Sequence, residues 1–163
     1  MGKRGALGAA ALGTALIGFG LLRNRVRRFE VTEDSMTPAL RPGDFVLASR
    51  LDSAPLRGDM VVFPHPAKPS LLMIKRVVGV PTETVTVSGG RVVANDHVVA
   101  EPWAQGALAG DFHWVLDSRH VIVLSDNRSL PTEDSRDLGP VPLTDFWRVG
   151  FRYWPPTRIG GVR

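Results

Sequence analysis

Residues 85–93 read Val-Thr-Val-Ser-Gly-Gly-Arg-Val-Val, and they indicate the fold class more clearly than any other stretch. Apolar and polar side chains alternate over residues 85–88, before Gly89-Gly90, and a period of two is typical of β-strands; a short apolar run, Val92-Val93, follows the glycines. The two glycines supply the positive φ angles that a tight hairpin turn requires. The stretch therefore predicts two antiparallel strands joined by a two-residue turn, and Asn95-Asp96 predicts a second turn after it.

Short apolar runs of the same kind occur along the rest of the chain, separated by Pro, Gly, Asp and Asn. Thirteen prolines discourage long helices, and only residues 37–40 show a short helical pattern. We therefore expect a mainly β fold of antiparallel strands. The expected strands are residues 45–47, 60–63, 73–74 with 77–78, 84–87, 91–93, 98–99 and 120–124.

The N-terminal segment differs from the rest. Residues 5–22 read GALGAAALGTALIGFGLL, an uncharged run that would span roughly 27 Å as a helix, near the minimum for crossing a bilayer. Arginines follow the run, where a cleaved signal peptide needs small residues, and an apolar surface on all sides fits lipid better than a protein core. We expect one transmembrane anchor with basic flanks over residues 1–28, and a β-rich domain over residues 29–163.

The net charge of +4 originates in that segment. Residues 1–28 hold six basic residues and no acidic one, whereas the rest of the chain holds 14 basic and 16 acidic residues. The β-rich domain is therefore not basic, and we expect no nucleic-acid partner. Basic residues lie on both sides of the apolar run, and the larger group follows it. The positive-inside tendency alone would keep the β-rich domain in the cytoplasm.

Several kinds of catalytic site are excluded or disfavoured by the residue types present. The chain has no cysteine, which excludes disulfides, a thiol nucleophile and cysteine-ligated zinc. The four histidines lack helical pairing or an HExxH pattern, so we expect no metal and no cofactor. A Ser-His-Asp triad is disfavoured because the chain has no Gly-x-Ser-x-Gly elbow.

Two residues can make a nucleophile of another kind. Ser35 lies in EDSMTPALRPGD (residues 33–44), and its hydroxyl needs a neighbouring base; the alternative is a helix N-cap. Lys75 lies among aliphatic residues in LLMIKRVVGVP (residues 71–81). Burial there would lower its pKa and make it a usable base; the alternative is a surface lysine paired with a carboxylate.

Four segments, in order, resemble the signature blocks of type I signal peptidases. The serine block, residues 35–44, and the lysine block, residues 75–81, are similar to the blocks that hold the family's nucleophile and general base. Residues 57–63 (RGDMVVF) resemble its Arg-Gly-Asp strand, and residues 125–136 (SDNRSLPTEDSR) resemble its Gly-Asp-Asn-Arg…Asp-Ser-Arg block. Four blocks in order, behind an apolar segment, make the resemblance specific.

The resemblance implies a membrane-bound serine endopeptidase whose antiparallel β-sheet catalytic domain, residues 29–163, is of the type shared by signal peptidases and LexA-like peptidases. It would remove signal peptides from exported preproteins, cleaving after small residues. Ser35 would be the nucleophile, Lys75 the general base, and the Ser35 backbone N–H the oxyanion donor. Its partners would be preproteins and the lipid bilayer, with the catalytic domain on the extracytoplasmic side.

The last block would supply the supporting residues. Thr132 stands where the family has a serine that contacts the lysine, and Asp134 with Arg136 would form a structural ion pair. The full set of expected supporting residues is Thr132, Asp134, Arg136, Asp126 and Arg128.

Some positions depart from the family pattern. Glu33 stands two residues before the nucleophile, where a hydroxyl often assists the oxyanion hole. An ionised carboxylate is only an acceptor and would repel an oxyanion. Ser125 replaces a glycine, which predicts strain in a turn that prefers positive φ.

Three further functions stay open from the sequence. They are a narrow-specificity maturation protease of one precursor, a LexA-like self-cleaving regulator, and an anchored binding module without activity. A LexA-like repressor would carry a helix-turn-helix in place of the apolar run. The C-terminal residues 146–154 (FWRVGFRYW) are either a final strand with aromatic side chains in the core or a membrane-interface contact.

Overall fold

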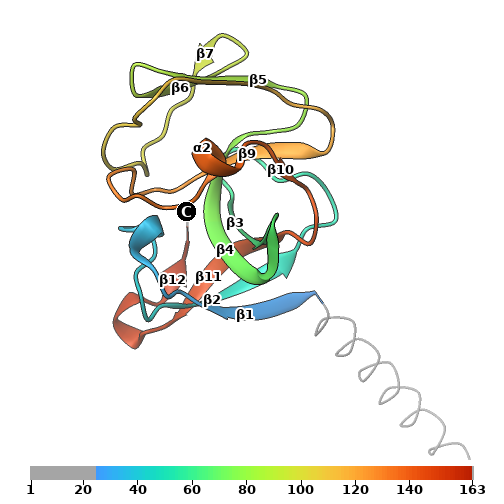
Figure 1. The fold of residues 1–163 in the computed structure, drawn as a ribbon. Helices are drawn as coiled ribbons and strands as arrows, with labels where there is room; N and C mark the ends of the chain where they lie inside the picture. The colour runs from blue at the N-terminus through green and yellow to red at the C-terminus, as the bar shows by residue number, and fades with distance from the viewer. Residues whose placement is uncertain (1–24, 163) are drawn as a thin grey trace, which may run out of the picture.

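The computed structural model describes residues 25–162, which form two antiparallel sheets (Figure 1). The larger sheet has the order β1-β2-β11-β3-β4-β9-β10, with β12 paired to β11, and the smaller has the order β7-β6-β5-β8. The predicted mainly β, antiparallel fold is confirmed. The strands are β1 (Val26–Glu30), β2 (Phe45–Arg50), β3 (Met60–His65), β4 (Lys68–Gly79), β5 (Thr84–Ser88), β6 (Arg91–Ala94), β7 (His97–Val98), β8 (Phe112–Val115), β9 (His120–Leu124), β10 (Val141–Pro142), β11 (Trp147–Trp154) and β12 (Gly160–Gly161).

The predicted hairpin is confirmed. Strands β5 and β6 pair from Val85 opposite Ala94 to Ser88 opposite Arg91. The two glycines between them have φ angles of 57° and 77°, as a two-residue turn with two left-handed positions requires. The second predicted turn is also present, because Asn95 and Asp96 have φ angles of 48° and 64°.

The helical segments are short, and one differs from its prediction. A 3-10 helix, η1, covers Asp34–Met36 and ends before the predicted helical residues 37–40. Thr37 is extended, with φ −68° and ψ 139°, because the ring of a following proline disfavours the helical conformation. The other short helices are α2 (Ser135–Leu138) and η2 (Pro156–Arg158).

The C-terminal aromatic segment forms strand β11, which lies between β2 and β3 in the larger sheet. The prediction of a final strand is thus confirmed, but only part of its aromatic content lies in the core. Phe146 and Trp147 are buried, whereas Phe151 and Trp154 are 40% and 50% exposed.

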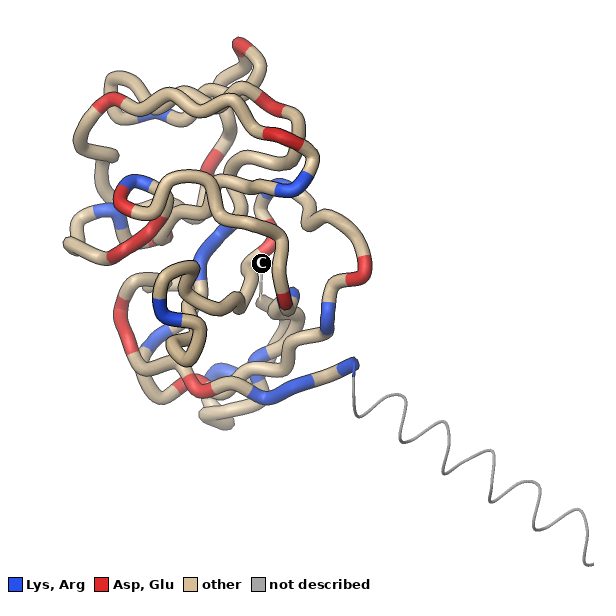
Figure 2. Tube along the Cα trace, turned by 45° about the vertical axis from the view of Figure 1, so that its right-hand side comes forward, with Lys and Arg blue, Asp and Glu red and all other residues tan. Residues whose placement is uncertain are grey.

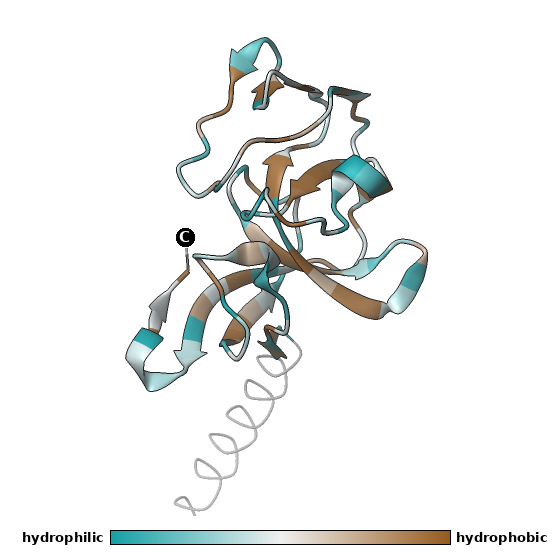
Figure 3. Ribbon diagram, turned by 60° about the vertical axis from the view of Figure 1, so that its left-hand side comes forward, coloured by the Kyte–Doolittle hydropathy of each residue, from teal (hydrophilic) through white to brown (hydrophobic). Residues whose placement is uncertain are grey.

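The two sheets share a hydrophobic core. Val78 of β4 and Ile122 of β9 pack in one cluster with Val85, Val87 and other apolar side chains of the smaller sheet and its loops. Apolar colouring follows the middle of the β-strands, while the turns are mostly hydrophilic (Figure 3). Through this shared core the smaller sheet packs against β4 and β9 of the larger sheet (Figure 1).

The described chain starts in the larger sheet. Strand β1 begins at Val26, so Arg27 and Arg28, expected in the anchor's basic flank, are strand residues, and the Arg27 guanidinium lies 4.6 Å from the centre of the Trp147 ring. Basic residues mark this first strand in Figure 2. No helix within residues 25–162 has the length and apolar composition needed to cross a bilayer. The predicted apolar run, residues 5–22, lies outside the described residues.

Candidate active site

Ser35 and Lys75 lie in contact. Nζ of Lys75 donates a hydrogen bond of 2.9 Å to Oγ of Ser35, and Lys75 is 3% exposed and Ser35 5%. Glu33, not Ser35, occupies the N-cap of η1, and it makes no side-chain capping bond. The capping alternative for Ser35 and the surface alternative for Lys75 are therefore wrong.

The backbone around Ser35 is fixed by two long-range contacts. The carbonyl of Ser35 accepts a 3.0 Å hydrogen bond from the amide of Asn127, and the amide of Val31 donates to the carbonyl of Asp44. The next side chain, Met36, is buried in the core of the larger sheet. Rigid elements on both sides of the nucleophile thus hold its hydroxyl in one place.

Strand β4 places Lys75 toward Ser35 and its neighbour Arg76 toward the opposite face, because side chains alternate along a strand. Burial lowers the pKa of Lys75, and this effect outweighs the nearby carboxylates of Asp134 and Glu33, which raise it. The desolvated amine is therefore more readily neutral than an exposed lysine. A neutral amine next to a hydroxyl can accept its proton.

A cleft of about 640 Å³ contains both residues. Residues 30–36 form one wall, residues 71–75 of β4 form a second, and residues 130–133 form a third. Strand β9 pairs with β4 only from Arg76 onward. Residues 71–75 of β4 line the cleft. On the side of β4 that faces β9 farther along the strand, these residues pair with no other strand among the described residues.

Asp134 and Arg136 form the expected ion pair. The guanidinium donates from Nε to Oδ1 at 2.9 Å and from Nη2 to Oδ2 at 2.8 Å, and the amide of Ser125 donates to Oδ2 at 3.0 Å. Burial alone would raise the pKa of Asp134, but these hydrogen bonds hold the pKa below its usual value. Asp134 also caps α2, so it joins that helix to the loop after β9.

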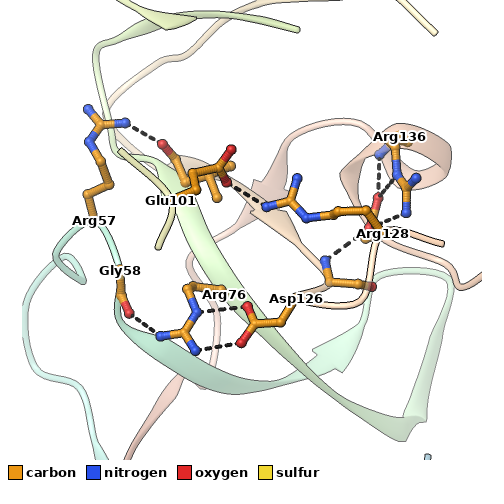
Figure 4. A network of polar contacts seen from close by, with 10 residues as sticks. Arg57, Gly58, Arg76, Glu101, Asp126, Arg128 and Arg136 are labelled. Carbon is orange, nitrogen blue, oxygen red and sulfur yellow. Dashed lines mark hydrogen bonds and ion pairs between the residues drawn. The ribbon is translucent and has the colours of Figure 1, made fainter. Parts of the chain in front are cut away.

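Asp126 and Arg128 do not pair with each other (Figure 4). Asp126 accepts two hydrogen bonds from Arg76, of 2.8 and 2.6 Å, and both side chains are almost fully buried. Arg128 pairs with Glu101 at 2.5 Å. The loop after β9 is therefore tied to β4 through one ion pair and to the segment after β7 through the other.

Thr132 does not reach Lys75 by a hydrogen bond. Its hydroxyl lies 2.7 Å from that of Ser125, although Thr132 lines the same cleft. The prediction of backbone strain at Ser125 is wrong, because Ser125 does not have a positive φ. Within residues 25–162, the residues other than glycine with a positive φ are Thr82, Asn95, Asp96 and Asp145. The hydroxyl of Ser125 thus bonds to Thr132 without a left-handed backbone.

Sequence reasoning did not single out Arg76 and Glu101. The alternation of side chains along a strand could have indicated Arg76. If Lys75 faces the cleft, the next side chain points to the opposite face of the sheet. A guanidinium buried there requires an acidic partner. Glu101 follows no local pattern, since its partner Arg128 is 27 residues away.

Known proteins of one family are similar to this chain in sequence. The chain matches the family model described as signal peptidase, peptidase S26, over residues 5–154. It is 35% identical over 145 residues to signal peptidase I of Leptolyngbya laminosa, covering 80% of this chain and 70% of the relative. It is 32% identical to signal peptidase I of Bacillus caldolyticus, over 78% of this chain and 79% of the relative. It is 31% identical to probable thylakoidal processing peptidase 2 of Arabidopsis thaliana, but covers only 39% of that protein.

Proposed function

Because this chain belongs to the signal peptidase family, peptidase S26, and is a serine endopeptidase that removes signal peptides, we propose that Ser35 is its nucleophile and Lys75 its general base. The observation that carries the proposal is the 2.9 Å contact between Nζ and Oγ. It lies within the range in which a base takes a proton from a nucleophile. The lowered pKa of Lys75 supports the same assignment.

In the proposed reaction, neutral Lys75 takes the proton of Ser35 while Oγ attacks the scissile carbonyl carbon. Collapse of the tetrahedral intermediate leaves an acyl-enzyme, and Lys75 gives the proton to the departing amine. Lys75 then activates the water that hydrolyses the acyl-enzyme and restores Ser35.

The oxyanion would be held by the backbone N–H of Ser35. This amide is near the start of a 3-10 helix, where the first N–H groups have no helical partner, and within residues 25–162 it donates no backbone hydrogen bond. A carboxylate at Glu33 cannot serve as a second donor. We therefore assign one donor to the oxyanion hole and treat Glu33 as an unfavourable neighbour of it.

The proposed substrate is an exported preprotein with small residues at the first and third positions before the scissile bond. It would lie in the cleft as an extended strand and pair with the free edge of β4 at residues 71–75, since main-chain pairing with an open sheet edge is a common way to bind peptides. The resemblance of the four sequence blocks to signal peptidases supports the preference for small side chains.

We further propose that residues 1–28 anchor the domain and that it acts on the extracytoplasmic side, close to the bilayer. Leu71 and Leu72, at the wall of the cleft, are 47% and 51% exposed, and Trp154 on β11 is 50% exposed. Aromatic and aliphatic side chains of this kind partition to the membrane interface. Protease added to intact spheroplasts should digest the domain if this orientation is right.

The test of the dyad is an assay of the purified full chain on a preprotein, beside Ser35→Ala and Lys75→Ala. We expect the wild type to release the signal peptide and both variants to lose at least about three orders of magnitude in rate. Cleavage by either variant at the wild-type rate would overturn the dyad. An inactive wild type would instead favour the anchored binding module.

The family match argues against the LexA-like regulator, and the same assay tests the alternative of a maturation protease of one precursor. The match to the signal peptidase model includes the apolar run, where a LexA-like repressor would have a helix-turn-helix. A narrow-specificity maturation protease would cleave one precursor in a panel of several. We expect cleavage of most members of the panel.

A further inference from the structure

His65, the last residue of β3, makes three polar contacts although its side chain is only 3% exposed. Nδ1 of the ring accepts hydrogen bonds from the amides of Ala67, at 3.0 Å, and Lys68, at 3.2 Å. A ring nitrogen that accepts a hydrogen bond carries no proton, so the single ring proton lies on Nε2. Nε2 lies 3.2 Å from Oε2 of Glu133 and therefore donates to it.

Glu133 belongs to a wall of the cleft that has little backbone support. Residues 130–133 line the active cleft, and they also line a second cavity of about 370 Å³. Within residues 25–162, their one backbone hydrogen bond is internal, from the amide of Thr132 to the carbonyl of Leu130. Side chains must therefore fix the position of this wall.

Two side-chain contacts connect the wall to the rest of the molecule. The hydroxyl of Thr132 lies 2.7 Å from that of Ser125, in the loop after β9, and the carboxylate of Glu133 accepts from His65. The second contact reaches β3, which pairs with β4 through residues that include Leu72 of the cleft. The histidine thus links one wall of the cleft to the strand that carries another.

We propose that His65, acting through Glu133, is a positioning residue that sets the distance between two walls of the cleft, residues 130–133 and residues 71–75 of β4. The inference rests on the proposed function, because the cleft between these walls is where the preprotein would bind. A loose wall must be ordered when the substrate enters, which lowers affinity, whereas a wall that is already fixed has no such cost. Loss of the contact should therefore raise KM and leave kcat nearly unchanged, since the Ser35 hydroxyl keeps its own base.

His65→Asn removes the contact with Glu133 and keeps the turn after β3. The asparagine side chain accepts from the amide two residues on, as Nδ1 of the histidine does, but it is too short to reach Glu133. We expect KM for a preprotein peptide to rise at least about threefold, the effect of losing one such hydrogen bond, with kcat within about twofold of wild type. The urea midpoint should change little, which separates positioning from a loss of folding.

Two changes at Glu133 identify the contact itself. Glu133→Ala should raise KM as much as His65→Asn, whereas Glu133→Gln should keep KM within about twofold of wild type, because its amide oxygen still accepts from Nε2. The double variant His65→Asn with Glu133→Ala should be no worse than either single variant, since both changes remove the same contact. Additive losses in the double variant, or an equal rise in KM for Glu133→Gln and Glu133→Ala, would overturn the inference.

His120→Asn is the matched control. His120 also contacts a carboxylate, that of Asp117 at 2.7 Å, but neither residue lines the cleft. The change should leave both KM and kcat within about twofold of wild type. A rise in KM as large as that of His65→Asn would show that the effect does not come from the wall, and the inference would be overturned.

Hydrogen exchange tests the position of the wall without any substrate. The amides of Thr132 and Glu133 should exchange at least about threefold faster in His65→Asn than in the wild type, while those of the paired residues of β3 and β4 should be unchanged. Unchanged exchange in the wall overturns the inference. Faster exchange with an unchanged KM also overturns it, because the contact would then hold the wall without any effect on substrate binding.

The proposed function can fail separately. If the wild type processes no preprotein while the wall exchanges faster in His65→Asn, the proposed function is overturned and the positioning of the wall by His65 is supported. If the wild type processes preprotein and His65→Asn changes neither the exchange nor KM, the proposed function stands and the inference is overturned.

Discussion

Lys75 lies in an environment that is unusual for a lysine. It is buried in strand β4, and its amine is hydrogen-bonded to Ser35. Its aliphatic neighbours predict burial from the sequence, but not its direction, because alternation along a strand leaves open which face points to the serine. Only the sequence blocks connect the two residues, which are 40 positions apart.

The pH dependence of the rate should follow Lys75. The lysine accepts the Ser35 proton only when it is neutral, and burial lowers its pKa below the ordinary value. We expect kcat/KM to rise with pH through this lowered pKa and then to level off. A pH profile measured on a peptide substrate checks it, with Lys75→Arg as the control that should be inactive throughout. A profile with no rising limb below the ordinary lysine pKa would contradict the assignment.

Glu33→Ser should make a faster enzyme. The change removes a carboxylate that repels the oxyanion and supplies a hydroxyl, and one added oxyanion donor is worth up to about 10²–10³ in rate. We expect a gain of at least about threefold. Because Glu33 raises the pKa of Lys75, the rising limb of the pH profile should also move to lower pH.

Glu30→Ser is the control for that experiment. Glu30 is exposed and lines the same cleft, but it is five residues from Ser35 in sequence and lies in strand β1. An equal gain in rate in both variants would show that the rate responds only to the net charge of the cleft. If Glu33→Ser gives no gain in rate, Glu33 does not act on the oxyanion.

The strands were predictable where the pattern is local. The β5–β6 hairpin follows from its alternation and its two glycines, and β9 is found at the expected residues. Strand β4 was predicted as two pieces, because Lys75 and Arg76 interrupt its apolar run. Each of these two side chains is buried only because a distant element supplies a partner, Ser35 for one and Asp126 for the other.

The pair between Arg76 and Asp126 should matter to stability as well as position. Asp126→Asn leaves a buried guanidinium without a charged partner, a change that costs about 3–5 kcal/mol of the free energy of unfolding. The double variant Arg76→Met with Asp126→Leu should recover most of this loss, since well-packed apolar groups often replace a buried ion pair without cost. Urea titration of the three proteins measures it.

An exposed ion pair provides the comparison. Arg50 and Asp145 are 2.6 Å apart, with side chains 51% and 58% exposed, and Asp145→Asn should cost less than about 1 kcal/mol. If Asp145→Asn and Asp126→Asn cost the same, burial is not what makes the Arg76 pair important.

At the scale of the whole molecule, the chain joins an uncharged run, residues 5–22, to a part of nearly balanced charge, with 14 basic and 16 acidic residues after residue 28. The charge of the domain, its β content and the order of its blocks were all readable from the sequence. The shared core of the two sheets and the contact of Glu101 with Arg128 were not, because they depend on pairing between segments far apart in the chain.

Residues 1–24 should decide where the protein is found in the cell. We expect the full chain to stay with membranes after a carbonate wash and to leave them only with detergent, because its apolar run is long enough to span a bilayer. A chain starting at Arg25 should bind membranes far more weakly. Immunoblotting of the fractions measures both, and a full-length chain in the soluble fraction would contradict the anchor.

Strand β11 has a consequence for how the protein is made. It begins at Trp147, yet it lies between β2 and β3. During synthesis both neighbours of β11 therefore leave the ribosome well before β11 does, and the larger sheet cannot close until β11 has followed them. Before that point the segment that holds Ser35, between β1 and β2, and strand β4, which holds Lys75, belong to two parts of the sheet that β11 has not yet joined. We therefore expect a nascent copy to gain its proteolytic activity only after β11 has been made.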